Sequence, residues 1–170
     1  MLIALGGGPR NRFARSAAQH IIARLPELQV TIAGGLLTRT PPHDTAGIGW
    51  LGPQRNLAAA FAAADIAVVA GGMTLYEAAA AGVPCVGIAV VDAQRPALRA
   101  FARAGAALHV MPLGTTLSDK AAAHVADAVA QLVACRSCRQ AQVAAGRGIV
   151  DGKGASRVAR ALVALAERSA

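Results

Sequence analysis

Residues 66–91 read IAVVAGGMTLYEAAAAGVPCVGIAVV, and this stretch decides the fold. The unbroken apolar run at 66–70 is typical of a strand that is buried on both faces. A helical pattern over 74–81 follows, and the Gly-Val-Pro sequence at 82–84 ends it. A second apolar run at 85–91 predicts another strand. Because two consecutive parallel strands need a crossover, this strand–helix–strand order predicts an α/β fold with a parallel sheet.

The rest of the chain repeats this alternation of short apolar runs and longer helical stretches. We predict strands at 1–5, 29–33, 48–51, 66–70, 85–91 and 107–110. We predict helices at 11–24, 57–64, 74–81, 96–104, 118–134, 139–147 and 154–168. No linker or internal repeat interrupts the pattern. We therefore expect residues 1–170 to form one domain, a Rossmann-like six-stranded parallel sheet with helices on both faces.

The composition limits the class of protein. Hydrophobic residues make up 55% of the chain and aromatic residues only 3%, so the core must consist mainly of Ala, Val, Leu and Ile. No apolar run approaches the ~20 residues that a membrane-spanning helix needs. Residues 1–5 lack the basic start of a signal peptide. We expect no integral membrane segment and a cytoplasmic location.

The net charge of +8 suits a polyanion, such as nucleic acid, or a phosphorylated small molecule. The arginines are spread over nearly every segment, however, and aromatic residues for base stacking are nearly absent. Cys135 and Cys138 form a C-x-x-C motif that no second pair completes into a zinc site. The motif is placed at a helix end, whereas a redox motif is expected directly after a strand. We expect no nucleic-acid partner, no metal and no cofactor.

Two glycine-rich turns mark the candidate binding site. Gly7 and Gly8 follow the first predicted strand, Gly72 follows the fourth, and each turn leads into a helix. Glycine lets the backbone approach an anion closely, and a helix N-terminus offers free N–H groups and a positive dipole. Ligands of open parallel sheets bind beyond the carboxyl ends of the strands. We predict a diphosphate site made by Gly7, Gly8, Gly72, Met73 and Thr74.

A nicotinamide or flavin dinucleotide is a poor match for these turns. The fingerprint G-x-G-x-x-G places a third glycine where this chain has Asn11. It also requires an acidic residue near the end of the second strand, and the predicted strand at 29–33 ends without one.

Thr74 and Glu77 allow two interpretations. A threonine followed three residues later by glutamate is a capping box, which needs no ligand. Alternatively, the N–H of Thr74 binds phosphate, and the carboxylate of Glu77, one helical turn later, accepts both ribose hydroxyls. The local pattern leaves both interpretations open.

The motif GGMTLYE at 71–77, followed by AGVP at 81–84, resembles the signature of the C-terminal domain of GT-B nucleotide-sugar enzymes. The similarity covers essentially the whole chain. Within these enzymes the sequence is most similar to the UDP-sugar hydrolases of pseudaminic acid biosynthesis and to the spore-coat polysaccharide proteins related to them. The tail VDGKGA at 150–155 is the most specific part of this resemblance.

The resemblance implies that the ligand is UDP or a UDP-sugar. It assigns the ribose to Glu77 and backbone contacts with uracil to Ile48, Gly49 and Trp50. It assigns the sugar hydroxyls to Asp92 and Gln94. Trp50 has an alternative role as the one large anchor of the core.

The sequence departs from the family pattern in two places. The family loop after the first strand reads Gly-Gly-Ser-Asp-Pro-Asn-Asn, whereas residues 7–12 read GGPRNR, which shifts the phosphate contact to Arg10 or Arg12. In the family the catalytic histidine belongs to an N-terminal Rossmann domain, which this sequence lacks. We therefore assign no catalytic residue and expect an N-terminal domain, in the same or a separate chain, as partner.

The resemblance implies the UDP-sugar-binding half of a hydrolase, in which water attacks the anomeric carbon of a UDP-amino sugar and UDP leaves. Two alternatives stay open. The chain is the C-terminal half of a GT-B glycosyltransferase, or a non-catalytic donor-binding subunit that pairs with a separate N-terminal-domain chain.

Overall fold

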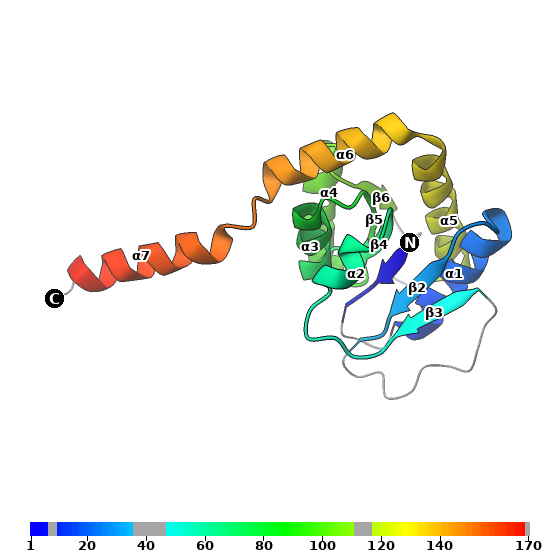
Figure 1. Cartoon of the computed structure of the whole chain (residues 1–170), viewed down its shortest axis with the longest axis horizontal. Coiled ribbons are helices and arrows are strands. Elements are labelled where there is room, and N and C mark those ends of the chain that lie inside the picture. Colours follow the sequence, from blue (N-terminus) through cyan, green and yellow to red (C-terminus); the bar gives the residue numbers. More distant parts are fainter. Residues whose placement is uncertain (7–9, 36–46, 111–116, 169–170) are drawn as a thin grey trace.

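The computed structural model describes residues 1–6, 10–35, 47–110 and 117–168. Six parallel strands form one sheet in the order β3-β2-β1-β4-β5-β6. The strands are β1 Leu2–Ala4, β2 Val30–Ala33, β3 Ile48–Leu51, β4 Ala67–Ala70, β5 Cys85–Ile88 and β6 Leu108–Val110. This strand order, with helices on both faces (Figure 1), confirms the predicted Rossmann-like α/β fold.

Helices cover both faces of the sheet. They are α1 Asn11–Arg24, α2 Ala58–Ala62, α3 Met73–Ala81, the short 3₁₀ helix η1 Asp92–Gln94, α4 Arg95–Arg103, α5 Asp119–Ala134, α6 Arg136–Ile149 and α7 Gly154–Arg168. On one face Ile3 of β1 belongs to a buried cluster with Ile21 of α1 and Val129 of α5. On the other face Leu2 of β1 is buried with Leu75 of α3. The predicted Ala-, Val-, Leu- and Ile-rich core thus lies in two layers.

Two boundaries differ by three residues from those predicted, and the others differ by two residues or fewer. The strand predicted at 85–91 ends at Ile88, because the N–H of Val90 donates to Oε1 of Gln94 (3.0 Å) instead of continuing the sheet. The helix predicted at 139–147 begins earlier, at Arg136.

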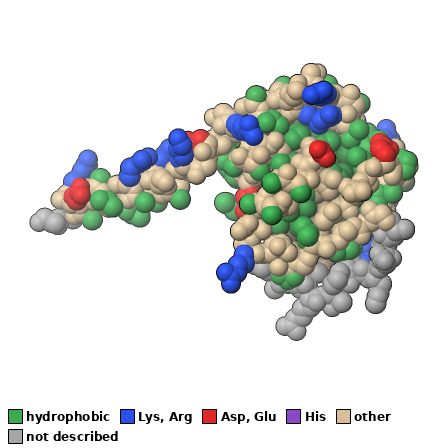
Figure 2. All heavy atoms as spheres, in the orientation of Figure 1, with side chains coloured by type: hydrophobic (Ala, Val, Ile, Leu, Met, Phe, Trp, Pro, Cys, Tyr) green, Lys and Arg blue, Asp and Glu red, His purple; other side chains and the backbone are tan. Residues whose placement is uncertain are grey.

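Helix α7 extends away from the rest of the molecule (Figure 1). Four large apolar side chains on it, Val158, Leu162, Val163 and Leu165, are between 58% and 62% exposed. Figure 2 shows hydrophobic side chains along one side of this helix and basic ones along the other. Among the described residues, no helix is both long and apolar enough to cross a bilayer.

Candidate functional site

The order of the strands reverses between β1 and β4. β1 pairs with β2 on one side and with β4 on the other. After β1 the chain enters α1 on one face of the sheet, and after β4 it enters α3 on the opposite face. Such a reversal leaves a crevice beyond the carboxyl ends of the two strands. Gly6 and Gly71 lie at the start of the two diverging connections.

A cavity of about 340 Å³ lies at this carboxyl edge of the sheet. Its walls are the residues that follow β1, β2 and β3 together with the first turns of α3. The lining residues are Ala4, Gly6, Ala33, Gly34, Gly35, Gln54, Arg55, Asn56, Leu57, Met73, Thr74 and Glu77. The structure therefore brings three of the predicted site residues, Met73, Thr74 and Glu77, to one cavity. We call it the carboxyl-edge cavity.

The turn between β4 and α3 needs Gly71, because neighbouring side chains leave no room for a Cβ there, and Gly72 is also closely approached. A Cβ on Gly71 would lie 2.6 Å from Cγ of Leu98, which is fully buried. A Cβ on Gly72 would lie 3.3 Å from Nε2 of Gln94. The absence of these side chains lets the turn pass close to α4 and directs the start of α3 toward the cavity.

The N-terminus of α3 offers donors to an anion in the carboxyl-edge cavity. Gly72 is the N-cap, and no side chain caps the helix. The N–H of Leu75 donates to the carbonyl of Gly72 (3.1 Å), but the N–H groups of Met73 and Thr74 precede it and have no acceptor within the helix. The positive end of the helix dipole adds to their attraction for phosphate.

The capping-box interpretation of Thr74 and Glu77 is wrong. Thr74 is the second residue of α3 rather than its N-cap, and its hydroxyl donates to the carbonyl of Ala70 (3.1 Å). Thr74 lines the cavity with its hydroxyl proton already engaged, so its backbone N–H is the donor left for a ligand. Glu77 is exposed at the cavity wall, and its carboxylate has no hydrogen-bond partner among the described residues. This carboxylate is available to accept hydroxyl donors from a ligand.

Arg10 lies at the start of α1, where it is the N-cap residue. Its Nε is buried and has no hydrogen-bond partner in the part of the chain that the structure describes. A buried donor without a partner is costly, and an anion beside it would satisfy it. Gly7 and Gly8, the two other residues predicted for this loop, lie outside the described residues.

Three polar residues that were not predicted from the sequence to bind a ligand also line the cavity: Gln54, Arg55 and Asn56. They follow β3, and in a parallel sheet the segment after each strand lies at the same edge. A run of polar residues shortly after a predicted strand was the signal that could have identified them. Oδ1 of Asn56 also accepts the N–H of Ala58 (3.2 Å), the first residue of α2, although the N-cap of that helix is Leu57.

The residues predicted near uracil lie within β3 and do not line the cavity. Ile48 is buried and Gly49 is exposed. Trp50 is half-buried and packs against the core on the α1 side, with the guanidinium of Arg15 5.9 Å from the centre of its ring. This placement favours the alternative role of Trp50 as a core anchor.

The residues predicted near the sugar lie in η1, after β5. Asp92 is exposed and forms an ion pair with Arg95 (2.8 Å). Gln94 uses its amide oxygen to bind the N–H of Val90 and rests against the Gly71-Gly72 turn. Neither side chain lines the cavity that contains Glu77.

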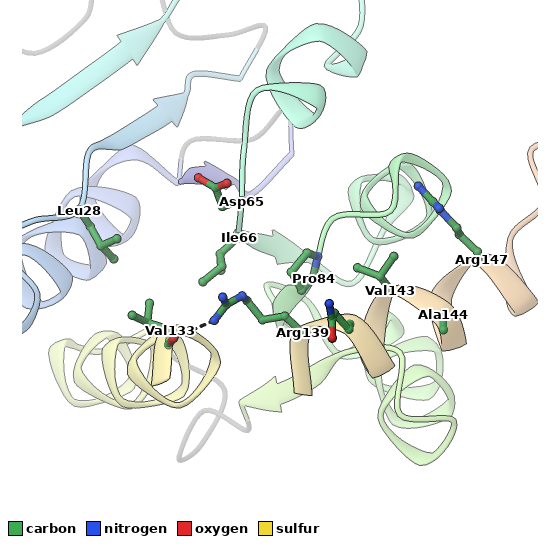
Figure 3. A pocket seen from close by; sticks show the side chains of 10 residues that line it. Leu28, Asp65, Ile66, Pro84, Val133, Arg139, Val143, Ala144 and Arg147 are labelled. Carbon is green, nitrogen blue, oxygen red and sulfur yellow. Dashed lines mark hydrogen bonds between the residues drawn. The ribbon is translucent and has the colours of Figure 1, made fainter. Parts of the chain in front are cut away.

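A larger cavity of about 560 Å³ lies at the opposite, amino edge of the sheet (Figure 3). Ile66 and Pro84 immediately precede β4 and β5 there. Figure 3 shows Arg139 directed toward Val133, and its Nη1 donates to the carbonyl of that residue (2.7 Å). We call this hollow the amino-edge cavity.

Ser16, His20 and Asp119 are the residue types of a hydrolase triad, but their arrangement is different. Oδ1 of Asp119 accepts from Ser16 (2.6 Å) and lies 3.1 Å from Nε2 of His20. A triad needs the histidine between serine and aspartate, and here the aspartate is central. The cluster connects α1 to α5. No group of three or more His, Cys, Asp and Glu side chains could hold a metal ion within the described ranges.

Comparison with known proteins gives one curated relative. The chain is 37% identical, over 105 residues, to the spore coat polysaccharide biosynthesis protein SpsG of Bacillus subtilis. The matched region is 62% of this chain but only 30% of the relative's length. No protein-family model matches the chain.

The solved structures with a similar fold include glycosyltransferases. The calicheamicin glycosyltransferase CalG4 superimposes with a TM-score of 0.68 and 24% identity, over 99% of this chain and 42% of that enzyme. The spinosyn rhamnosyltransferase SpnG in complex with thymidine diphosphate superimposes with a TM-score of 0.62 and 18% identity. The match covers 88% of this chain and 40% of that enzyme. At these identities the similarity establishes the fold. The chain thus spans less than half the length of the proteins it matches, and none of these three proteins is described as a hydrolase.

Proposed function

We propose that this chain binds the nucleoside diphosphate of a nucleotide-sugar, as the donor-binding domain of a GT-B glycosyltransferase. The observation that carries the proposal is the carboxyl-edge cavity at the reversal of strand order, with the N-terminus of α3 and Glu77 in its wall. The solved glycosyltransferases of the same fold favour transfer over the hydrolysis that the sequence suggested.

The diphosphate is the part of the ligand that the cavity suits best. Its oxygens would accept from the N–H groups of Gly72, Met73 and Thr74 at the positive end of α3. Arg55 lines the same cavity, and Arg10 has a buried donor at the start of α1. Both guanidinium groups are always charged and bind phosphate oxygens strongly.

The ribose would be held by Glu77. An ionised carboxylate can accept two hydroxyl donors at once, and charge-assisted hydrogen bonds of this kind are the strong ones. We further propose that the nucleotide is UDP. Its uracil would lie beside residues 48–50, and its sugar would lie beside Asp92 and Gln94.

The contribution of this domain to catalysis would be electrostatic. When the bond between the anomeric carbon and the diphosphate breaks, negative charge grows on the leaving diphosphate. Fixed N–H donors and arginines beside that group lower the barrier without any proton transfer. The general base, in this proposal, belongs to an N-terminal Rossmann domain that completes the cleft, in the same chain or as a separate partner.

Titration calorimetry of the 170-residue chain tests the binding proposal. We expect UDP to bind with a Kd no tighter than about 10 μM, some −7 kcal/mol, because this domain supplies only part of the cleft. ADP should bind more weakly than UDP. Equal heats for the two nucleotides would contradict the selectivity for uracil, and no heat with either would contradict nucleotide binding.

The choice between transfer and hydrolysis needs a separate experiment. We expect no UDP release from a UDP-sugar by this chain alone, since a general base contributes about 10²–10⁴ in rate. With a matching N-terminal domain added in trans, release that depends on a sugar acceptor would support the glycosyltransferase. Equal release without acceptor would support the hydrolase instead.

A further inference from the structure

The C-x-x-C motif occupies the junction between α5 and α6. Cys135 ends α5 and is the N-cap of α6, and Cys138 lies in the first turn of α6. The two cysteines form a disulfide. The N–H of Cys138 also donates to Sγ of Cys135 (3.2 Å). The motif therefore begins a helix of 14 residues, for which the sequence pattern predicts a start only at residue 139.

The disulfide adds little as a structural cross-link. It joins residues only three apart in sequence, and cross-links that close such short loops restrict the unfolded chain least. The junction is also held without it, because Nη1 of Arg139 donates to the carbonyls of Leu132 (2.5 Å) and Val133 (2.7 Å) at the end of α5. A role other than cross-linking is therefore needed to explain the pair.

The surroundings of the pair favour a reactive thiol. Thiols at helix N-termini and in C-x-x-C motifs have lowered pKa values, because N–H donors and the positive helix end stabilise the thiolate. The sulfur of Cys135 is in this position, with the N–H of Cys138 directed at it. Arg136, the next residue in the chain, adds positive charge.

Access differs between the two sulfur-bearing side chains. Cys138 is exposed and lines a hollow of about 330 Å³, whereas Cys135 is half-buried. The hollow has apolar walls from Leu108 and Leu132, with Gln131 at its side. An incoming thiol can therefore reach Cys138 first. Thiol–disulfide exchange is fastest when the accessible sulfur is attacked and the sulfur that leaves is the better-stabilised thiolate.

We propose that Cys135 and Cys138 form a redox-active site that exchanges with an external dithiol. A thiolate of the dithiol attacks Sγ of Cys138, the disulfide breaks, and the electron pair leaves on Sγ of Cys135. The second thiol of the dithiol then attacks the mixed disulfide and releases Cys138. Two electrons and two protons pass to this chain, and the dithiol becomes a disulfide. The site does not depend on nucleotide binding, because neither cysteine lines the carboxyl-edge cavity.

Cys85 provides an internal control for this chemistry. It is fully buried in β5, and burial raises its pKa to about 12. It therefore stays an unreactive thiol at neutral pH. Any labelling of the folded protein at neutral pH reports on the proposed site.

The test is a redox titration of the folded chain with mixtures of reduced and oxidised glutathione, followed by acid quenching, alkylation and mass spectrometry. We expect Cys135 and Cys138 to pass reversibly between disulfide and dithiol while Cys85 remains unlabelled. In a Cys138→Ser variant, we expect the alkylation rate of Cys135 to rise with a midpoint at least about one pH unit below that of free cysteine. A Gln140→Ala variant, changed at an exposed position of α6, should titrate like the wild type.

A second variant tests whether Cys138 is the sulfur that is attacked first. A Cys135→Ser variant should accumulate a mixed disulfide between Cys138 and glutathione, since the internal sulfur that would release it is gone. Two results would overturn the proposal: a disulfide that resists a large excess of reductant while the chain stays folded, or a reduced pair that oxidised glutathione does not reoxidise. The titration of the unmodified chain decides this even if a variant fails to fold.

Discussion

The two edges of the sheet each carry a cavity, and the smaller one is the better candidate for a binding site. The carboxyl-edge cavity measures about 340 Å³ and the amino-edge cavity about 560 Å³. Size alone would select the amino edge. The direction of the strands selects the other, because connections diverge beyond the carboxyl ends of β1 and β4.

The helix dipoles also favour the carboxyl edge over the amino edge as an anion-binding site. α1 and α3 begin at the carboxyl edge, so their positive ends face it, whereas α5 ends at the amino edge with its negative end. Arg139 in the amino-edge cavity already binds the last carbonyls of α5. A diphosphate would therefore meet two helix N-termini at the carboxyl edge, whereas at the amino edge Arg139 is already engaged and Arg147 is the other arginine of the cavity. We therefore expect the polarity of the backbone, rather than the volume of a cavity, to decide where an anion binds.

The largest effect is expected from paired substitutions of one acid at each edge. Glu77→Gln removes the charge that we propose accepts the ribose hydroxyls, and it should weaken UDP binding by about 1.5–3 kcal/mol. The free energy of unfolding of this variant should differ from that of the wild type by less than about 0.5 kcal/mol, since Glu77 is exposed and is not part of a capping box. Asp65→Asn, in the amino-edge cavity, should leave UDP binding unchanged. Calorimetry of both variants checks the pair, and the opposite pattern would reverse the assignment of the edges.

A smaller effect, on stability, is expected at the turn that leads into α3. Gly71→Ala places a Cβ against the buried side chain of Leu98, and overpacking of this kind costs about 1–3 kcal/mol. Gly148→Ala is the control, because no atom lies within 4 Å of its Cβ position in α6. It should raise stability by up to about 1 kcal/mol. Urea unfolding measures both, and a Gly71→Ala chain as stable as the wild type would show that Leu98 does not confine the turn.

The smallest effect concerns Asp119, whose role we take to be structural. Hydrogen bonds from Ser16 and from His20 lower the pKa of this exposed carboxyl group. A lowered pKa in the folded state means that the stabilisation is present above the unfolded pKa of about 3.9 and is lost as the pH falls through the folded value. Asp119→Asn should therefore be slightly less stable than the wild type at pH 6, with a difference that shrinks toward pH 3. Unfolding curves across this range measure it, and loss of UDP binding would show that the cluster belongs to the site.

The sequence was sufficient for most of the fold. The predicted helix 11–24 and strand 48–51 match α1 and β3 residue for residue, because their apolar patterns and flanking residues are strong. The end of β5 was missed because it depends on the side chain of Gln94, which takes the N–H of Val90. The start of α6 was missed because a cysteine sulfur, an uncommon cap, accepts the N–H of Cys138.

The site was predictable only where it is local. Met73, Thr74 and Glu77 lie within one motif, and the structure places them on one cavity. Arg55 joins them only because β3 runs parallel to β1 and β4, and that depends on the order of the whole sheet. The roles of Asp92 and Gln94 rested on family resemblance, and they stay predictions, since both side chains form contacts with neighbouring residues instead of lining this cavity.

The most direct test of the account is a titration of the ¹⁵N-labelled chain with UDP, followed by ¹H–¹⁵N correlation spectra. If the diphosphate binds at the carboxyl edge, the largest shifts should fall on the amides of Gly6, Gly72, Met73 and Thr74. The amides of Ile66 and Val143, which line the amino-edge cavity, should stay in place. Shifts concentrated on the latter pair, with α3 unaffected, would contradict the account.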